Sequence, residues 1–336
     1  MRIVIGMLFA IFFCCNILAA QQAKPAIQSV LVSQSMLFDI VNVNDGFMIA
    51  VGERGHIIRA EQASSWQQMN VPSQSTLTAV TFVNNQLGWA VGHDGIILHS
   101  NNGGLSWTIQ QYLPQLQIPL LDVAFISETE GVALGAYGLF FRTLDGGITW
   151  EQEFHTSLLA QEDIDYLEEL RIEDEQLYIE ERSSILPHFN RIFRVGRTTY
   201  LVGELGLLAK SNDFGKTWQR YDEIYQGSFF DIVRTQKGNL LAVGLRGNSF
   251  RSLTNGTPWQ KTETAVTSLL NSIVLTDQTQ IFILGNNGVL LESNDDGQSY
   301  IKHLQSDGKA LLAGVIFNNQ LVVASEVGIK VLSVVN

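Results

Sequence analysis

Residues 89–107 read WAVGHDGIILHSNNGGLSW, and this pattern recurs along the chain. It consists of an apolar run, a Gly-x-x-Gly turn, a second apolar run, a polar turn and a closing aromatic residue. Further copies cover residues 133–150, 201–218, 242–259 and 283–300, with a worn copy at 49–66 and a truncated one at 322–335. The lead positions are Gly52, Gly92, Gly135, Gly203, Gly244, Gly285 and Ser325. Their spacing is 40–43 residues, except for one interval of 68.

A period of about 40 residues with several short strands per unit is typical of propeller blades. The seven copies therefore predict an all-β chain folded as a seven-bladed β-propeller. In the second copy we expect four strands, at residues 77–83, 88–91, 96–99 and 107–111. Glycine is expected at both ends of each Gly-x-x-Gly turn because the turn needs positive φ there.

The two ends of the chain suggest how the ring closes. The last copy stops after its third strand, and residues 26–33 precede the first copy without a blade of their own. We therefore expect residues 26–336 to form one propeller, in which strand 26–33 completes blade seven from outside and hides two sheet edges.

The polar turn carries a second signature, Ser/Thr-x-Asp-x-Gly-x-Thr-Trp, at residues 143–150 and 211–218. It resembles the Asp-box repeat of bacterial neuraminidases. With the preceding Val-Gly-x-x-Gly, the chain resembles the photosystem II assembly and stability factor family of plastids and cyanobacteria, and its relatives in non-photosynthetic bacteria. The resemblance covers roughly residues 35–335. It implies a seven-bladed propeller on the far side of a membrane that assists assembly of a membrane protein complex.

The same resemblance implies a basic patch for the client. Seven residues after the lead position, four blades carry a cation at equivalent places on the expected third strand: Arg59, Arg142, Lys210 and Arg251. Two interpretations stand side by side. The four side chains form a cationic band, or the position is a solvated polar site of the repeat, since strand residues alternate between faces.

Residues 1–20 have the layout of a secretory signal peptide, with Arg2 before an apolar run and small residues before Gln21. A lipoprotein anchor on Cys14 and an uncleaved anchor are the alternatives. Both cysteines, Cys14 and Cys15, lie in this segment, so the mature chain is expected to have no thiol chemistry. We expect export to the periplasm, or to the thylakoid lumen in a photosynthetic host, with at most peripheral membrane attachment.

The formal net charge of −12 argues against nucleic-acid binding, which relies on Lys and Arg at phosphates. Most of this charge lies where the repeat is interrupted. The long interval places an insertion at residues 155–190, between blades three and four. Residues 161–182 hold ten acids against Arg171 and Arg182, and leucines near helical spacing predict one or two short helices ended by Pro187.

In a propeller, the connection from a fourth strand to the next first strand lies on the same face as the Gly-x-x-Gly tips. The insertion is therefore expected to overhang that face. We hypothesise that it forms, with the tips, the binding surface for a membrane or envelope protein complex. The candidate residues are Glu53, Arg54, His93, Asp94, Tyr137 and Arg246 on the tips, and Glu168, Glu169, Glu173, Asp174 and Glu175 on the insertion. The alternative is a solvated, tolerated loop.

Thirteen residues before the lead positions lies a second set of polar residues, on the expected innermost strands: Asp39, Asp122, Asn190 and Asp231. Their oxygens suit a hard cation at the channel mouth. The alternative is that the carboxylates accept hydrogen bonds from exposed backbone.

An enzyme is the rival function. Sialidases use an Arg triad and an early Arg-Ile-Pro motif, whereas here Arg54 precedes Gly55. Convergence of Asp39, Asp122 and Asp231 leaves other glycosidases open, and glycan binding without hydrolysis is a further alternative. The six histidines are scattered, and there is no phosphate-binding Gly-Lys-Ser/Thr loop. We therefore expect a non-catalytic protein without a cofactor or bound metal.

Overall fold

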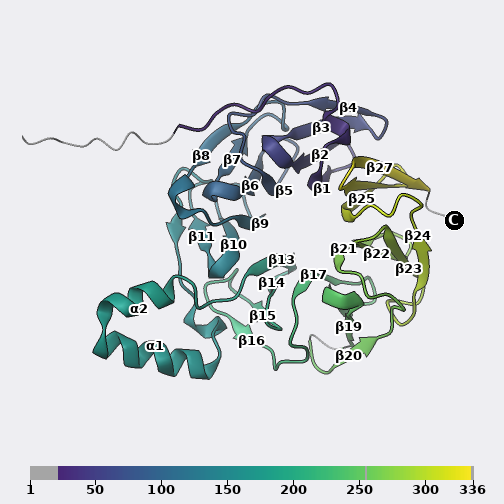
Figure 1. Cartoon of the computed structure of the whole chain (residues 1–336). Coiled ribbons are helices and arrows are strands. Elements are labelled where there is room, and N and C mark those ends of the chain that lie inside the picture. The colour runs from purple at the N-terminus through teal and green to yellow at the C-terminus, as the bar shows by residue number, and fades with distance from the viewer. Residues whose placement is uncertain (1–21, 254–255, 334–336) are drawn as a thin grey trace, which may run out of the picture.

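Seven antiparallel sheets stand in a ring in the computed structural model, which describes residues 22–253 and 256–333 (Figure 1). Six sheets have four strands and the last has three. The prediction of an all-β, seven-bladed propeller is confirmed. The expected signal peptide at residues 1–20, with Cys14 and Cys15, lies outside the described residues.

The strands follow the repeat in chain order. Blades one to three consist of β1 Leu37–Val43, β2 Phe47–Gly52, β3 Ile57–Gln62, β4 Ser65–Gln68; β5 Leu77–Phe82, β6 Gly88–Gly92, β7 Ile97–Ser100, β8 Thr108–Gln111; β9 Leu120–Phe125, β10 Gly131–Gly135, β11 Phe140–Thr143, β12 Glu151–Gln152. Blades four and five consist of β13 Phe189–Val195, β14 Thr198–Gly203, β15 Leu208–Ser211, β16 Gln219–Arg220; β17 Phe229–Arg234, β18 Leu240–Gly244, β19 Ser249–Ser252, β20 Trp259–Thr262. Blades six and seven consist of β21 Leu270–Leu275, β22 Ile281–Gly285, β23 Val289–Ser293, β24 Ile301–Leu304; β25 Leu311–Phe317, β26 Gln320–Ser325, β27 Gly328–Ser333.

The second strand of each blade lies in the middle of the packing. The sequences FMIAVG in β2, LLAVG in β18 and IFILG in β22 are buried at every residue. A strand covered on both faces by neighbouring sheets reads as a continuous apolar run rather than as an alternation. The aromatic residues that close the polar turns add to this packing, since Trp107 and Trp218 are buried.

The two glycines of each tip serve different purposes. The second glycine has positive φ, as at Gly55 (72°) and Gly138 (69°), which confirms the expected role. The lead glycine instead has extended backbone, with φ of −168° at Gly52. A Cβ there would lie 2.2 Å from the carbonyl oxygen of Met36, so this position requires glycine because two backbones approach closely. The prediction of positive φ at the lead position is wrong.

The polar turns are held by their own side chains. In blade four, the Ser211 hydroxyl accepts hydrogen bonds from the backbone N–H groups of Asp213 and Gly215. The Asp213 carboxylate accepts from the Thr217 N–H (2.9 Å) and hydroxyl (2.6 Å). Slight desolvation of the carboxylate raises the pKa of Asp213, but these bonds outweigh it and hold the pKa at about 2. A short polar turn thus satisfies its own backbone without depending on a partner.

The N-terminal segment 26–33 does not complete blade seven. It contains no strand and runs along blade one, where Ala26 N–H donates to Val71 O (2.9 Å) and Ser29 N–H to Gln68 Oε1 (2.8 Å). The prediction of an outer strand in blade seven is therefore wrong. The segment's hydrogen-bond partners are Val71 O and the Gln68 side chain of blade one, and not a strand edge of blade seven.

Apolar packing closes the ring instead. Val32, Ile40, Ala313 and Phe317 are buried in one cluster between blades one and seven. The short turn η1 (Val32–Gln34) lies against β27, where a Cβ on Gly328 would meet the carbonyl oxygen of Ser33 at 1.9 Å. The two ends of the propeller therefore meet through side-chain contact and one close backbone approach.

The insertion between blades three and four forms two helices, α1 (Gln161–Glu173) and α2 (Glu175–Arg182), as the leucine spacing predicts. Leu158, Leu159 and Leu167 pack into the core cluster of blades three and four, and Arg220 of β16 donates to Leu158 O (3.2 Å). The helices therefore dock on the outer side of the ring. Figure 1 shows them projecting sideways beyond it, and they do not cover the tip face as expected.

Candidate partner-binding surface

The tips present some of the predicted residues to solvent and use others for packing. Arg54, Tyr137 and Arg246 take left-handed φ of 53–57° at the third position of the turn and are exposed. His93 is also exposed, whereas Asp94 accepts a hydrogen bond from the Ser75 hydroxyl at 2.6 Å. Glu53 accepts from the Met36 N–H at 3.3 Å. Glu53 and Asp94 therefore stabilise the connections that run past their tips.

The insertion reaches the tip of blade three through its last residues. The Tyr137 and His188 rings meet edge to face with centroids 4.6 Å apart. A Cβ on Gly138 would lie 2.3 Å from the Cβ of Leu186, so the tip glycine permits this contact. The structure thus joins one predicted tip, that of blade three, to the insertion.

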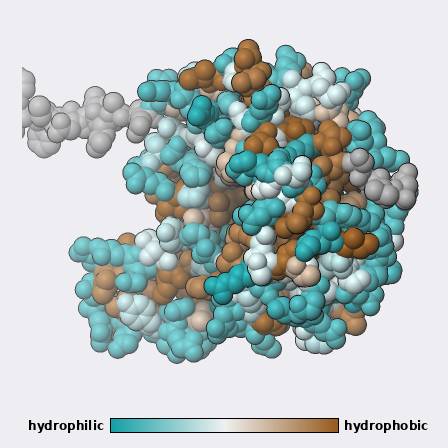
Figure 2. Space-filling model, turned by 45° about the vertical axis from the view of Figure 1, so that its right-hand side comes forward, coloured by the Kyte–Doolittle hydropathy of each residue, from teal (hydrophilic) through white to brown (hydrophobic). Residues whose placement is uncertain are grey.

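The predicted acids of the insertion are all exposed: Glu168, Glu169, Glu173, Asp174 and Glu175. Asp174 also caps α2, since its Oδ1 accepts from the Leu177 N–H at 3.0 Å. Apolar side chains lie among the acids, with Ile172 83% and Ile179 61% exposed. Figure 2 shows the protruding insertion with hydrophobic and hydrophilic side chains interspersed. We call this set of acids with Ile172 and Ile179 the insertion surface.

The predicted polar ring lies where the first strands line a channel cavity of about 120 Å³. Asp39, Asp122 and Asp231 are buried, and each carboxylate accepts a backbone N–H from the first strand of the next blade, at 2.7–2.9 Å. These are the hydrogen bonds to exposed backbone that the sequence left as one alternative. Among the described residues, no group of three or more acids, histidines or cysteines is placed to hold a metal ion.

The fourth predicted member, Asn190, is one position out of register. In β1 and β9 the ring residue lies two after the partner of the lead glycine, as in Leu37↔Gly52 and Asp39↔Val51. In blade four the pairs are Phe189↔Gly203 and Arg191↔Val202, because this hairpin is one residue shorter. The residue equivalent to the ring aspartates is therefore Arg191, which counting back from the glycine missed.

Arg191 lies between two ring carboxylates. Its Nη1 is 3.6 Å from Asp122 Oδ1, and its Nε is 3.7 Å from Asp231 Oδ1. Burial raises the pKa of Asp122 and of Asp231, and the arginine opposes that rise. Burial likewise raises the pKa of Asp39 to about 6. The channel therefore contains one guanidinium that compensates a cluster of desolvated acids.

Asn190 has a different role in the same channel. Its Nδ2 donates to Phe229 O of blade five at 2.8 Å. Thr78 of blade two and Asn271 of blade six donate in the same way, to Leu120 O and Leu311 O at 2.7 Å. Blades one, three and five thus reach forward with an aspartate to an N–H, and blades two, four and six with a hydroxyl or amide to a carbonyl.

The proposed basic band is largely a set of clamps between blades. Arg59, Arg142 and Arg251 donate to backbone carbonyls in the polar turn of the next blade, at Gly103, Phe214 and Asp296 respectively, over 2.7–3.1 Å. Lys210 instead lies over the Tyr221 ring, 5.3 Å from its centroid. Since the three arginines are engaged with the fold, the cationic-band interpretation is wrong for them. Their position is not simply solvated either.

Residues 57–118 match the model of a family described as the photosynthesis system II assembly factor YCF48. They run from β3 through blade two to the connection before β9. Among the described residues, neither helix has the length and hydrophobicity to cross a bilayer. A search of curated proteins found no match to the sequence.

Three solved structures illustrate the fold match. A structure named "YCF48 bound to D1 peptide" has 18% identity and a TM-score of 0.68, covering 94% of this chain and all of its own. YCF48 from Cyanidioschyzon merolae has 14% identity and a TM-score of 0.66, covering 92% of this chain and 97% of its own. The WD40 propeller domain of Doa1 has 12% identity and a TM-score of 0.64, covering 93% and 95%. The chain is thus a seven-bladed propeller that is similar to the photosystem II assembly factor family, as its repeats predict.

Proposed function

We propose that this chain is an exported, non-catalytic assembly factor that binds a segment of a membrane or envelope protein. The observation that carries the proposal is the match of residues 57–118 to an assembly factor family. A propeller similar over 94% of this chain was solved with a peptide of the D1 protein, so in that protein the fold holds a peptide. The signal-like residues 1–20 support export.

The insertion surface and the adjoining tip of blade three are the proposed docking site. The acids there are exposed, and residues 161–182 contain only two arginines to balance them. Exposed Ile172 and Ile179 supply apolar contact area within the charged field. Complementary charge steers association, and buried apolar side chains supply much of the affinity. The partner segment is therefore basic and amphipathic.

The channel supports a structural role better than a catalytic one. The carboxylates that an enzyme would need, Asp39, Asp122 and Asp231, accept backbone N–H groups of neighbouring blades. Arg191 compensates their charge. In this arrangement the carboxylates link neighbouring blades, and the partner protein binds to the outer surface of the ring.

Crosslinked affinity capture from intact membranes tests the proposal. Deleting the whole insertion is a poor variant, because Leu158 and Leu186 are part of the core. A better variant neutralises the acids while keeping the helices: E168Q, E169Q, E173Q, D174N and E175Q. The matched control neutralises five exposed acids elsewhere on the ring: E151Q, D222N, E223Q, E263Q and D277N.

The two outcomes separate the site from the function. We expect the wild type and the matched control to recover the same membrane protein, and the insertion variant to recover at least tenfold less of it. Equal recovery from all three proteins would move the docking site away from the insertion. Failure of the wild type to enrich any membrane or envelope protein would overturn the proposed function itself.

A further inference from the structure

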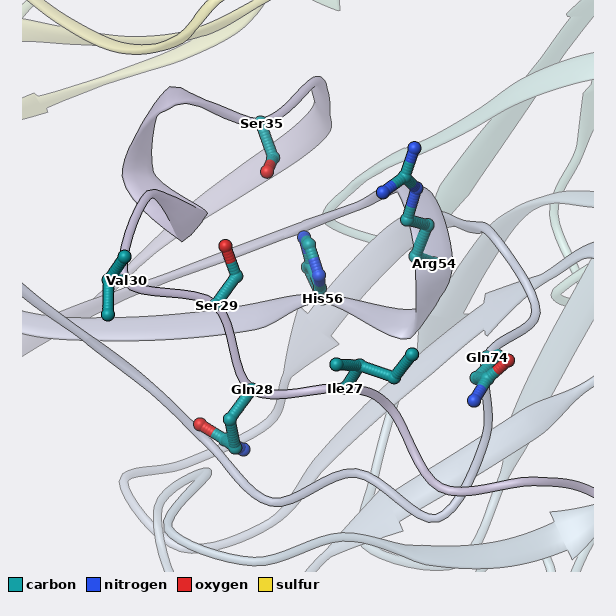
Figure 3. A pocket seen from close by; sticks show the side chains of 8 residues that line it. All are labelled: Ile27, Gln28, Ser29, Val30, Ser35, Arg54, His56 and Gln74. Atoms are coloured by element: carbon teal, nitrogen blue, oxygen red, sulfur yellow. The ribbon is translucent and has the colours of Figure 1, made fainter.

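A cavity of about 510 Å³ opens beside the tip of blade one (Figure 3). One wall is the N-terminal segment, with Ile27, Ser29 and Val30, and the other is the blade itself, with Arg54 and His56. Figure 3 shows His56 standing between the segment and Arg54. This volume lies in the range of small-molecule sites.

The segment that forms the wall is fixed in place by glutamine side chains. Gln68 donates through Nε2 to Ile27 O at 3.0 Å and accepts from the Ser29 N–H. Gln74 donates to Pro25 O at 2.9 Å, and Gln28 donates to Met69 O at 3.3 Å. The cavity is therefore held open by ordered contacts on both sides of the segment.

His56 is the unexplained residue of this cavity. Its side chain is only 3% exposed, Nδ1 is fully buried, and no described residue forms a hydrogen bond with either ring nitrogen. Buried polar groups in folded proteins nearly always have a partner, because leaving one unsatisfied is destabilising. Because Nδ1 has no accessible surface, a ligand in the cavity would meet the imidazole at Nε2, which also lacks a hydrogen bond from any described residue.

The repeat itself shows that a polar residue is not needed here. The position four after the lead glycine holds Ile96, Leu139, Leu207 and Val289 in blades two, three, four and six. Blade five has Asn248, whose Nδ2 donates to Leu245 O at 2.8 Å and so has a partner. At this position of the repeat, His56 is the one polar residue without a partner among the described blades, and leucine occupies the position in two blades.

Arg54 supplies a charge at the mouth of the cavity. Its side chain is 77% exposed and has only a loose ion pair, with Nε 3.9 Å from Glu53 Oε2. Two of the guanidinium donors suit a planar carboxylate. Because Glu53 stands beside it, a singly charged group is favoured over a phosphate dianion. Ile27 and Val30 are 70% and 99% exposed and form an apolar lip.

We propose that this cavity binds a small organic monocarboxylic acid, with Arg54 on the carboxylate, His56 donating one N–H and the apolar lip covering the body of the ligand. This site is separate from the insertion surface, and its test does not depend on the client. In this proposal the N-terminal segment forms one wall of the binding site.

The test titrates the full chain with 3-phenylpropionate and follows the histidine ring signals by NMR, with 3-phenylpropionamide as the neutral probe. H56L carries the residue that blades three and four use at this position, and R54Q removes the charge. R246Q is the matched control, since Arg246 occupies the same turn position with the same left-handed φ on blade five. Thermal unfolding of each variant confirms that it is folded.

We expect 3-phenylpropionate to shift the His56 signals saturably, and the amide to bind at least tenfold more weakly. R54Q and H56L should each weaken binding at least tenfold, R246Q should leave it unchanged, and H56L should be at least as stable as the wild type. If the shifts do not saturate at ligand concentrations up to roughly 10 mM, the dissociation constant is weaker than millimolar, and the proposal is overturned. Equal binding of acid and amide, equal losses in R54Q and R246Q, or marked destabilisation by H56L would also overturn it.

Discussion

Replacing Arg142 by methionine tests how much the buried ion pair of a third-strand arginine stabilises the propeller. Arg142 is 6% exposed, and its Nε and Nη2 bind the Glu153 carboxylate at 2.6 and 3.0 Å. Its Nη1 donates to Phe214 O of blade four at 3.0 Å. Removing one partner of a buried pair costs about 3–5 kcal/mol. Because the Glu153 side chain is 29% exposed and can take up water, we expect R142M to cost about 2–4 kcal/mol.

Urea unfolding followed by tryptophan fluorescence measures this loss as a lower midpoint with an unchanged slope. The double variant R142M/E153M removes both charges and loses the carbonyl bond and the contact of Glu153 with His155 Nε2 (3.2 Å), so it should recover to within about 1–2 kcal/mol of wild type. R59M is the counterpart with an exposed acid, since the Glu61 partner of Arg59 is 68% exposed. It loses the bond to Gly103 O but leaves no buried charge, so it should cost about 1 kcal/mol. Equal losses for R142M and R59M, or no recovery in the double variant, would refute the reasoning.

Three further predictions concern the ring, the turns and the tips. Burial raises the pKa of Asp39 from its ordinary value of 3.8 to about 6, so its contribution favours folding below pH 4 and is lost as pH rises towards 6. D39N should remove a slope worth about 3 kcal/mol from the stability–pH profile, and an unchanged profile would contradict this. S211A leaves a buried turn N–H unpaired and should cost about 1–3 kcal/mol in urea unfolding, whereas a neutral variant would show that the turn does not depend on its hydroxyl. G196A puts a Cβ at positive φ into open space and should cost about 1 kcal/mol in urea unfolding. G138A puts a Cβ at positive φ against Leu186 and should cost more; equal losses would show that the contact with Leu186 has no effect.

The blade count could be predicted because each blade repeats the same backbone requirement. The lead glycine is needed because a Cβ at its position would lie 2.0–2.7 Å from a backbone carbonyl oxygen, and that requirement recurs at the same place in six blades. A requirement set by backbone contact leaves a fixed mark in the sequence. The insertion was equally visible, because it interrupts a regular spacing.

The register of the channel residues could not be predicted by counting from the glycine. The hairpin of blade four turns in two residues, at Gly196 and Arg197, and so places Arg191 where Asn190 was expected. Counting forward from the apolar start of the first strand would have worked, since Phe189 corresponds to Leu37 and Leu120. The apolar residue is anchored in the core, whereas the turn length is free to vary.

The role of the basic positions was hidden for a different reason. Arg59, Arg142 and Arg251 each bind a carbonyl that belongs to the next blade, and an interaction between blades leaves no spacing signal within one repeat. The unpaired state of His56 likewise leaves no signal within its own repeat, because no described residue forms a hydrogen bond with its buried Nδ1. Only comparison of equivalent positions across blades, after the structure aligned them, identified it.

The ring also explains why its ends meet as they do. Blades one, three and five reach forward with an aspartate, and blades two, four and six with Thr78, Asn190 or Asn271. An alternation of two cannot close in a ring of seven, so two odd blades must adjoin. They do so between blades seven and one, where Ala313 stands at the ring position and the apolar cluster takes over. A polar link remains nearby, from Asn42 Nδ2 to Ile316 O at 2.8 Å. The seam therefore depends on shape and apolar contact, and the segment that leaves it is free to run along blade one and build a cavity there.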